Sequence, residues 1–264
     1  MSDAPERDVR FRGGGYEVRP RRFVPWLVFG MLLLLWHVAT TRGWVSAIAL
    51  PTPKSVILAF GEMIDAGTLQ KHLWESARRI ALGWALGTLA GLAVGLSMGI
   101  FSIARAGFLP LVSALFPIPK IALLPLFILW FGIGESSKVA TIAFGVFFPT
   151  VIAAYAACDS VPRNLIRMAQ SFGLPARHIV WKVVVPGAMP GILAGFRITA
   201  SIALILVVAA EMIGAEFGIG AYILATGNLM QTDHLLAGVA ILSVFGLLVS
   251  WLLSAIEKSV LRWR

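Results

Sequence analysis

The sequence predicts an all-α, polytopic membrane protein with about six transmembrane helices. Of its 264 residues, 58% are hydrophobic and only 13% are charged, whereas soluble domains carry about 25% charged residues. Several uncharged stretches, such as residues 23–41 and 80–104, are long enough to cross about 30 Å of hydrocarbon at about 1.5 Å per residue. The net charge of +9 comes from arginines at the edges of these stretches, as topology determinants do, and does not indicate a nucleic-acid site.

The first part of the chain is expected to form a tail and one span. The charged residues 1–22 are read as a cytoplasmic tail, and residues 23–68 as the first transmembrane helix followed by an outer amphipathic helix over 54–66. Arg19, Arg21 and Arg22 precede the span and place the N-terminus in the cytoplasm.

Residues 69–256 are expected to form the transmembrane domain, and residues 257–264 a cytoplasmic C-terminal tail. Prolines interrupt the apolar stretch after residue 108, which predicts a short interfacial helix, a break at 117–119 and then a span. This span is expected to line the interior, because backbone groups that lose their hydrogen bonds need protein or water partners within lipid. The Gly-rich outer loop 214–234 is expected to hold a short helix. The expected spans of this domain are 80–104, 120–133, 139–158, 191–213 and 235–256.

Six spans place both termini in the cytoplasm together with residues 159–190, which carry four basic residues, Arg163, Arg167, Arg177 and Lys182. Lys71, Arg78 and Arg79 then fall outside and count against this topology. We keep it because the reversed topology would put three larger basic clusters outside.

Five glycines in the span 80–104 recur every four residues: Gly83, Gly87, Gly91, Gly95 and Gly99. Small residues at this spacing allow another helix to approach closely within lipid. Each step of four residues overshoots a full turn by about 40° at about 100° per residue. We therefore expect this glycine stripe to serve a steeply crossing helix or two neighbours in turn.

Two charges lie within spans, Arg197 and Glu211, and an intramembrane charge is a functional-site hypothesis by default. Arg197 lies near the cytoplasmic side, so the alternative is a contact with lipid headgroups. Glu211 lies near the outer end, at the depth of Lys138 on the neighbouring span. A Glu211–Lys138 contact in an outer gate is one hypothesis, and a hydrated carboxylate at the interface is the other.

The polar segment 159–190 has internal order that suggests a docking element, although a loop lying on the bilayer is the alternative. Ser160 is expected to cap a first helix with Pro162 in its first turn, and Gly173 to end that helix in a left-handed conformation. A second helix over 176–184 is expected to end at Pro186. The first helix sets an apolar side against a polar one: Leu165, Ala169 and Phe172 against Arg163, Arg167 and Gln170.

The sequence lacks the common motifs for nucleotide binding, metal binding and nucleophilic catalysis. It contains no G-x-x-x-x-G-K-[ST] phosphate loop, no metal-ligand spacing of Cys or His and no G-x-S-x-G element. We therefore expect no enzyme, no metal site and no ATP hydrolysis in this chain.

At Ala169, Gly173 and Val183-x-Val185-Pro186 the sequence resembles the EAA loop of permease subunits of ATP-binding-cassette (ABC) importers. Met168 stands where the motif has its first alanine, and Arg167 replaces its glutamate, which reverses the charge. The resemblance extends from about residue 69 to the C-terminus. Four further segments resemble the branch that includes nitrate, sulfonate and taurine importers: 50–53, 117–119, 129–134 and 209–214.

This resemblance implies a type I importer permease in the bacterial inner membrane that works as a homodimer. Residues 159–190 would be the loop that couples it to two copies of a separate ATPase, which bind ATP and magnesium, and an external solute-binding protein would deliver the solute. A small anion as substrate would require a basic residue facing the cavity, for which Lys120 and Arg197 are the candidates. The alternatives are an ATPase-independent secondary transporter or channel and a membrane-embedded enzyme.

Overall fold

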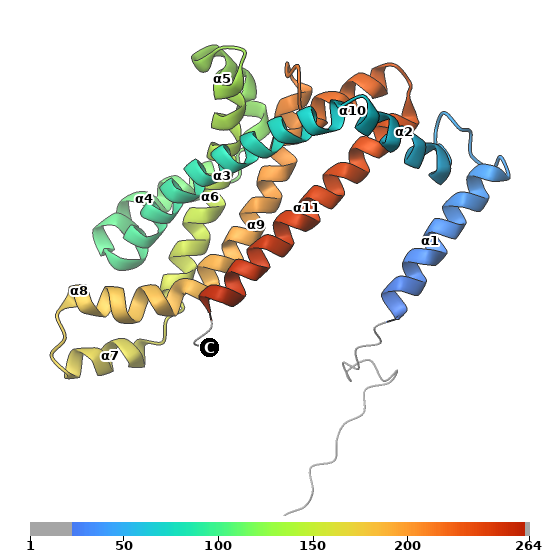
Figure 1. Cartoon of the computed structure of the whole chain (residues 1–264). Coiled ribbons are helices and arrows are strands. Elements are labelled where there is room, and N and C mark those ends of the chain that lie inside the picture. The colour runs from blue at the N-terminus through green and yellow to red at the C-terminus, as the bar shows by residue number, and fades with distance from the viewer. Residues whose placement is uncertain (1–22, 262–264) are drawn as a thin grey trace, which may run out of the picture. The chain divides into compact units, whose positions relative to one another are not determined.

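The computed structural model describes residues 23–261, and these form helices joined by short loops (Figure 1). The chain divides into two compact units, residues 1–53 and 54–264. The expected tail 1–22 lies outside the described residues, as does the end of the expected tail 257–264.

The described part of the first unit holds one helix, α1, Val24–Thr41, close to the expected span. Pro25 lies in its first turn, where the missing N–H would have no helical partner. Trp36 Nε1 donates a hydrogen bond of 2.9 Å to Pro51 O, which fixes the chain after the helix.

The expected amphipathic helix is α2, Pro53–Asp65, whose residues from Lys54 onward open the second unit. Gly67, with φ +67°, turns the chain directly into α3, Thr68–Ile100, so this helix starts well before the expected residue 80. The charged turn before residue 80 stays helical because its side chains find ion-pair partners within the fold. The remaining elements are α4 Ser102–Leu115, η1 Lys120–Leu123, α5 Leu124–Phe131, α6 Glu135–Asp159, α7 Arg163–Ser171, α8 Ala176–Ile179, η2 Val180–Val184, α9 Val185–Met212, α10 Ile219–Asn228 and α11 Thr232–Val260.

Within the described residues, 5 helices are long and apolar enough to cross a membrane: α1, α3, α6, α9 and α11. The span that contains α9 begins with α8 and η2. A sixth span results if α4 and the η1–α5 segment are counted together, and these are bent by 89°. The break expected at 117–119 is confirmed. Within one chain, however, α5 buries only Leu124 and Phe127, so most of this segment does not lie in the interior of the single chain.

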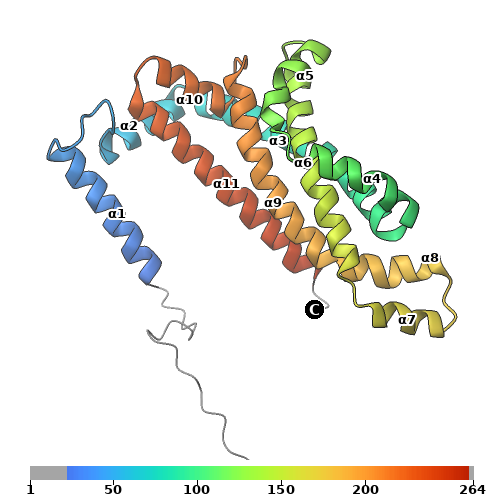
Figure 2. The ribbon, with the colours of Figure 1, turned by 180° about the vertical axis from the view of Figure 1, so that it is seen from behind.

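Different short helices lie at the two ends of the second unit (Figures 1 and 2). The helices α7 and α8 lie at the end where α11 finishes, and α10 lies at the opposite end (Figures 1 and 2). Segment 159–190 therefore shares one side with the end of α11, as an even number of spans between them requires.

All five glycines of the stripe face a single neighbour, α6. A Cβ on Gly83 would lie 2.6 Å from Ile142 Cβ, one on Gly87 would lie 2.3 Å from Ala143 O, and one on Gly99 would lie 2.5 Å from Cys158 Cβ. The residue numbers rise together, so α3 and α6 run in the same direction. Both expected alternatives, a steeply crossing helix and two neighbours in turn, were wrong, because one helix that follows the oblique four-residue row stays in contact along the whole stripe.

Pro186 does not end the second helix of segment 159–190, contrary to the expectation. It lies in the first turn of α9, directly after the π-helical turn η2. A proline clashes with the carbonyl of the preceding helical turn, and the wider π turn, with its i→i+5 bonds, leaves room for the ring. The chain from Ala176 to Met212 is therefore one continuous candidate span.

Candidate functional site

Segment 159–190, called the docking segment below, is a helix–turn–helix between two spans. The turn depends on Gly173, whose φ of +69° is left-handed, and a Cβ there would meet nothing within 4 Å. Leu174 N donates to Ala169 O at 3.3 Å, which satisfies one of the last carbonyls of α7. Glycine is thus required for conformation and not for space, and the expected left-handed end of α7 is confirmed.

Ser160 does not cap α7, as had been expected. Its hydroxyl donates to Ala157 O at 2.8 Å, so it serves the end of α6, and Pro162 precedes α7 without a side-chain cap. The last carbonyls of a helix have no N–H partner within it, and at the end of α6 the Ser160 hydroxyl supplies one such donor.

The docking segment is held by a small apolar core. Ala169, Ile179 and Val184 are buried against residues of α6 and α9 that include Ala157 and Ala188. Of the motif residues, Val183, Val185 and Pro186 are partly buried, which ties the second half of the segment to the start of α9.

The apolar side of α7, which continues to Phe172 directly after the helix, is largely exposed. Met168 is 53% and Phe172 77% exposed, and Leu165 is also exposed, so of the expected apolar side only Ala169 faces the core. Arg167 and Gln170 are exposed on the same helix. An exposed apolar patch on a polar, well-anchored helix is typical of a protein–protein contact.

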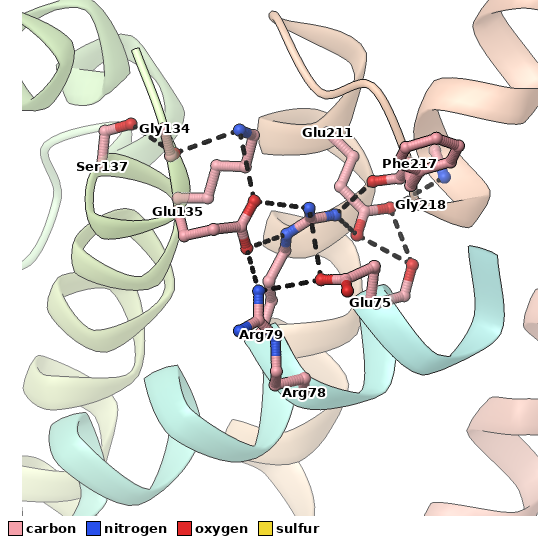
Figure 3. Close-up of polar contacts among 12 residues, drawn as sticks. Glu75, Arg78, Arg79, Gly134, Glu135, Ser137, Glu211, Phe217 and Gly218 are labelled. Atoms are coloured by element: carbon pink, nitrogen blue, oxygen red, sulfur yellow. Dashed lines mark hydrogen bonds and ion pairs between the residues drawn. The ribbon is translucent and has the colours of Figure 1, made fainter. Parts of the chain in front are cut away.

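A cluster of charged side chains lies near the other end of the unit, and we call it the ion cluster: Glu75, Arg78, Arg79, Glu135, Lys138 and Glu211 (Figure 3). Arg79 of α3 is its centre, with a side chain only 3% exposed. Its Nε and Nη2 donate to the two oxygens of Glu135 at 2.7 and 2.6 Å, and its Nη1 donates to Glu211 Oε1 at 2.8 Å. One guanidinium therefore joins the starts of α3 and α6 to the end of α9.

The carboxylate of Glu211 is fully buried and accepts hydrogen bonds on both oxygens. Ser76 Oγ lies 2.8 and 2.9 Å from them, and Gly220 N donates at 2.9 Å. The loop before α10 is wrapped around this carboxylate: a Cβ on Gly218 would lie 2.3 Å from its carboxyl carbon. Arg79 also donates to Phe217 O at 2.6 Å, so the cluster fixes this loop.

Lys138 is not the partner of Glu211 that the sequence suggested. Its Nζ donates to Gly134 O at 3.1 Å and lies 3.8 Å from Glu135 Oε1. Glu211 is also not a hydrated interfacial carboxylate, since its side chain is 0% exposed. Arg79 and Glu135 were not predicted as partners of Glu211 because both lie outside the expected spans.

The three acids and three bases of the ion cluster have a formal charge of zero. This neutrality permits burial, because a buried charge is costly unless paired. It also weakens the objection that Arg78 and Arg79 raise against the expected topology, because each is bonded to a carboxylate.

Arg197 and Lys120, the two residues considered for a substrate anion, are both engaged. Arg197 forms an ion pair with Glu257 of α11. The Lys120 ammonium donates to three backbone carbonyls, at 3.0, 2.6 and 2.6 Å. In this conformation neither offers a free cation to a solute.

Comparison with known proteins gives consistent matches. Residues 87–262 match the model of the family described as the binding-protein-dependent transport system inner membrane component. The taurine transport system permease protein TauC of Escherichia coli is 35% identical, covering 88% of this chain and 86% of TauC. The putative aliphatic sulfonates transport permease protein SsuC of Bacillus subtilis is 36% identical, covering 90% and 86%. Among solved structures, an inward-facing MetNI methionine ABC transporter chain has a TM-score of 0.62 at 22% identity, covering 73% of this chain and 95% of that one.

Proposed function

The chain belongs to the family of binding-protein-dependent transport inner membrane components and is a permease subunit of an ABC importer, and we propose that it carries a small sulfonate inward with energy from a separate ATPase. The docking segment is the observation that carries the proposal. A transport subunit driven from outside needs a stiff element that receives force, since a flexible loop would not transmit a displacement.

The exposed face of α7 fits a protein partner. Leu165, Met168 and Phe172 offer apolar contacts, and phenylalanine and methionine are enriched in protein–protein interfaces. Arg167, where the family motif has a glutamate, would meet acidic residues of the ATPase. We place ATP and magnesium in that partner, two copies of which would serve two copies of this chain.

The proposed orientation puts both termini and the docking segment in the cytoplasm of a bacterial cell. Two arginines support this placement, Arg163 at the start of α7 and Arg177 in α8. The end of the unit that carries α10 and the ion cluster then faces outward, where a solute-binding protein would deliver the substrate.

A small sulfonate is proposed as the substrate because TauC and SsuC, named for taurine and aliphatic sulfonates, align with most of this chain. Arg197 and Lys120 are engaged in other bonds. We therefore place sulfonate recognition on uncharged donors of the pathway and on the solute-binding protein.

Pull-down of the ATPase encoded with this chain tests the docking role. Phe172→Ala is expected to weaken its binding about tenfold or more, because the ring is 77% exposed and is the largest side chain of the patch. Phe29→Ala, which removes a ring 58% exposed on α1, is the matched control and should leave binding unchanged. Reconstituted complex should then import labelled taurine only with ATP. Equal binding by both variants would exclude α7 as the docking face, and ATP-independent import would favour a secondary transporter.

A further inference from the structure

Lys120 lies at the bend between α4 and α5, where the chain turns by 89°. Its ammonium donates to Leu115 O at 3.0 Å and to Phe116 O and Ile118 O at 2.6 Å each. It also lies 5.0 Å from the centre of the Phe148 ring. All three N–H donors of the lysine are thus used within the chain.

These carbonyls need a donor because of the local sequence. In a continuous helix Leu115 O would accept from the N–H of residue 119, but that residue is a proline and has none. Ile118 N reaches Leu115 O only at 3.3 Å, and α4 ends at Leu115, directly before Phe116. The two prolines remove backbone N–H donors, and the ammonium of the lysine that directly follows them donates to the carbonyls in their place.

The stem of Lys120 is seated on α6. A Cβ on Gly145 would lie 3.6 Å from Lys120 Cβ, which is an ordinary van der Waals distance, so the stem of Lys120 packs directly beside α6. The next residue, Ile121, packs against the core that includes Ile142 and Val146. The ammonium is therefore held in a fixed place relative to α6.

The other end of the α5 segment is held by a second lysine. Lys138 donates to Gly134 O in the loop that follows α5. Between these two points α5 leaves Leu129 and Trp130 exposed, at 78% and 62%. A short helix with breaks at both ends depends on such bonds for its position.

We propose that Lys120 is a positioning residue for transport: its ammonium occupies a cage of three carbonyls and fixes α5 as a wall of the solute pathway. The cage requires both positive charge and convergent N–H donors, so it selects a primary ammonium group. The transport part of this inference rests on the proposed function, whereas occupation of the cage does not.

Chemical rescue tests the cage directly. Lys120→Ala removes three methylene groups and the ammonium, which n-propylammonium replaces atom for atom. The apparent melting temperature of the purified variant in detergent is expected to fall by about 5 °C or more, through the lost charge-assisted bonds, and n-propylammonium at millimolar concentrations should restore most of it. Neither n-propanol, which lacks charge, nor tetramethylammonium, which lacks N–H donors, should do so. Lys54→Ala, at an exposed lysine of α2, is the control and should respond to none of the three.

Transport by the reconstituted complex provides the second readout. Lys120→Ala should lower the maximal rate of taurine import at least tenfold with little change in KM, and n-propylammonium should recover it. A raised KM with an unchanged maximal rate would overturn the proposal, since Lys120 would then contact the solute. Failure of n-propylammonium to restore melting would also overturn it. If wild-type complex imports no taurine but rescue of melting succeeds, the substrate is wrong and the cage stands.

Discussion

Replacing Arg79 by methionine is expected to destabilise the second unit far more than replacing its neighbour Arg78. Without Arg79, the fully buried Glu211 carboxylate keeps the hydrogen bonds of Ser76 and Gly220 but loses its cation. Removing one partner of a buried pair costs about 3–5 kcal/mol. Arg78 is 43% exposed and binds carboxylates that are themselves partly exposed, so its loss should cost about 1 kcal/mol or less.

Thermal unfolding of the purified protein in detergent measures this difference. One kcal/mol shifts the melting temperature by about 2–4 °C in a unit of about this size, which gives about 6–20 °C for Arg79→Met and at most about 4 °C for Arg78→Met. Adding Glu211→Gln to Arg79→Met removes the uncompensated charge, so the double variant should lose less than the sum of the single losses, by about 0.5–3 kcal/mol. Equal shifts for the two arginine variants, or additive losses in the double variant, would show that the buried pair does not hold these helices together.

The pattern of apolar residues, together with the glycines and prolines at turns and breaks, predicted most of the fold. Span positions followed from uncharged stretches, α2 from its amphipathic pattern, and the turn after α7 from Gly173, because only glycine readily adopts φ +69°. Each of these signals is local. The break before η1 could also be predicted, since Pro117 and Pro119 remove backbone donors whatever the neighbours are.

Pairings between distant segments could not be read from the sequence. Arg79, Glu135 and Glu211 are far apart in the chain and meet only because α3 and α6 run in the same direction beside α9. The available signal was charge balance. Three acids and three bases fall near one end of the expected spans, and the arginines among them conflict with the positive-inside rule in the expected topology. Basic residues on a side where that rule disfavours them indicate that carboxylates neutralise them. A separate signal was available for Lys120, because it directly follows two prolines that remove backbone N–H donors.

Two glycines separate the effects of space and of conformation. Gly87→Ala should destabilise the unit by about 1–3 kcal/mol in thermal unfolding, because its Cβ would lie 2.3 Å from the Ala143 carbonyl oxygen and backbone cannot move aside cheaply. Gly107→Ala in α4 meets nothing within 4 Å and should be neutral or slightly stabilising; similar losses at both sites would refute close packing of α3 on α6. Gly173→Val should abolish the stimulation of the partner ATPase and transport while membrane insertion remains, because a side chain at φ +69° strains the turn that aims α7. Gly67→Val carries the same strain at φ +67° in equally open space but lies outside the docking segment, so its ATPase stimulation should persist. If both valine variants lose stimulation alike, general strain and not the docking geometry controls coupling.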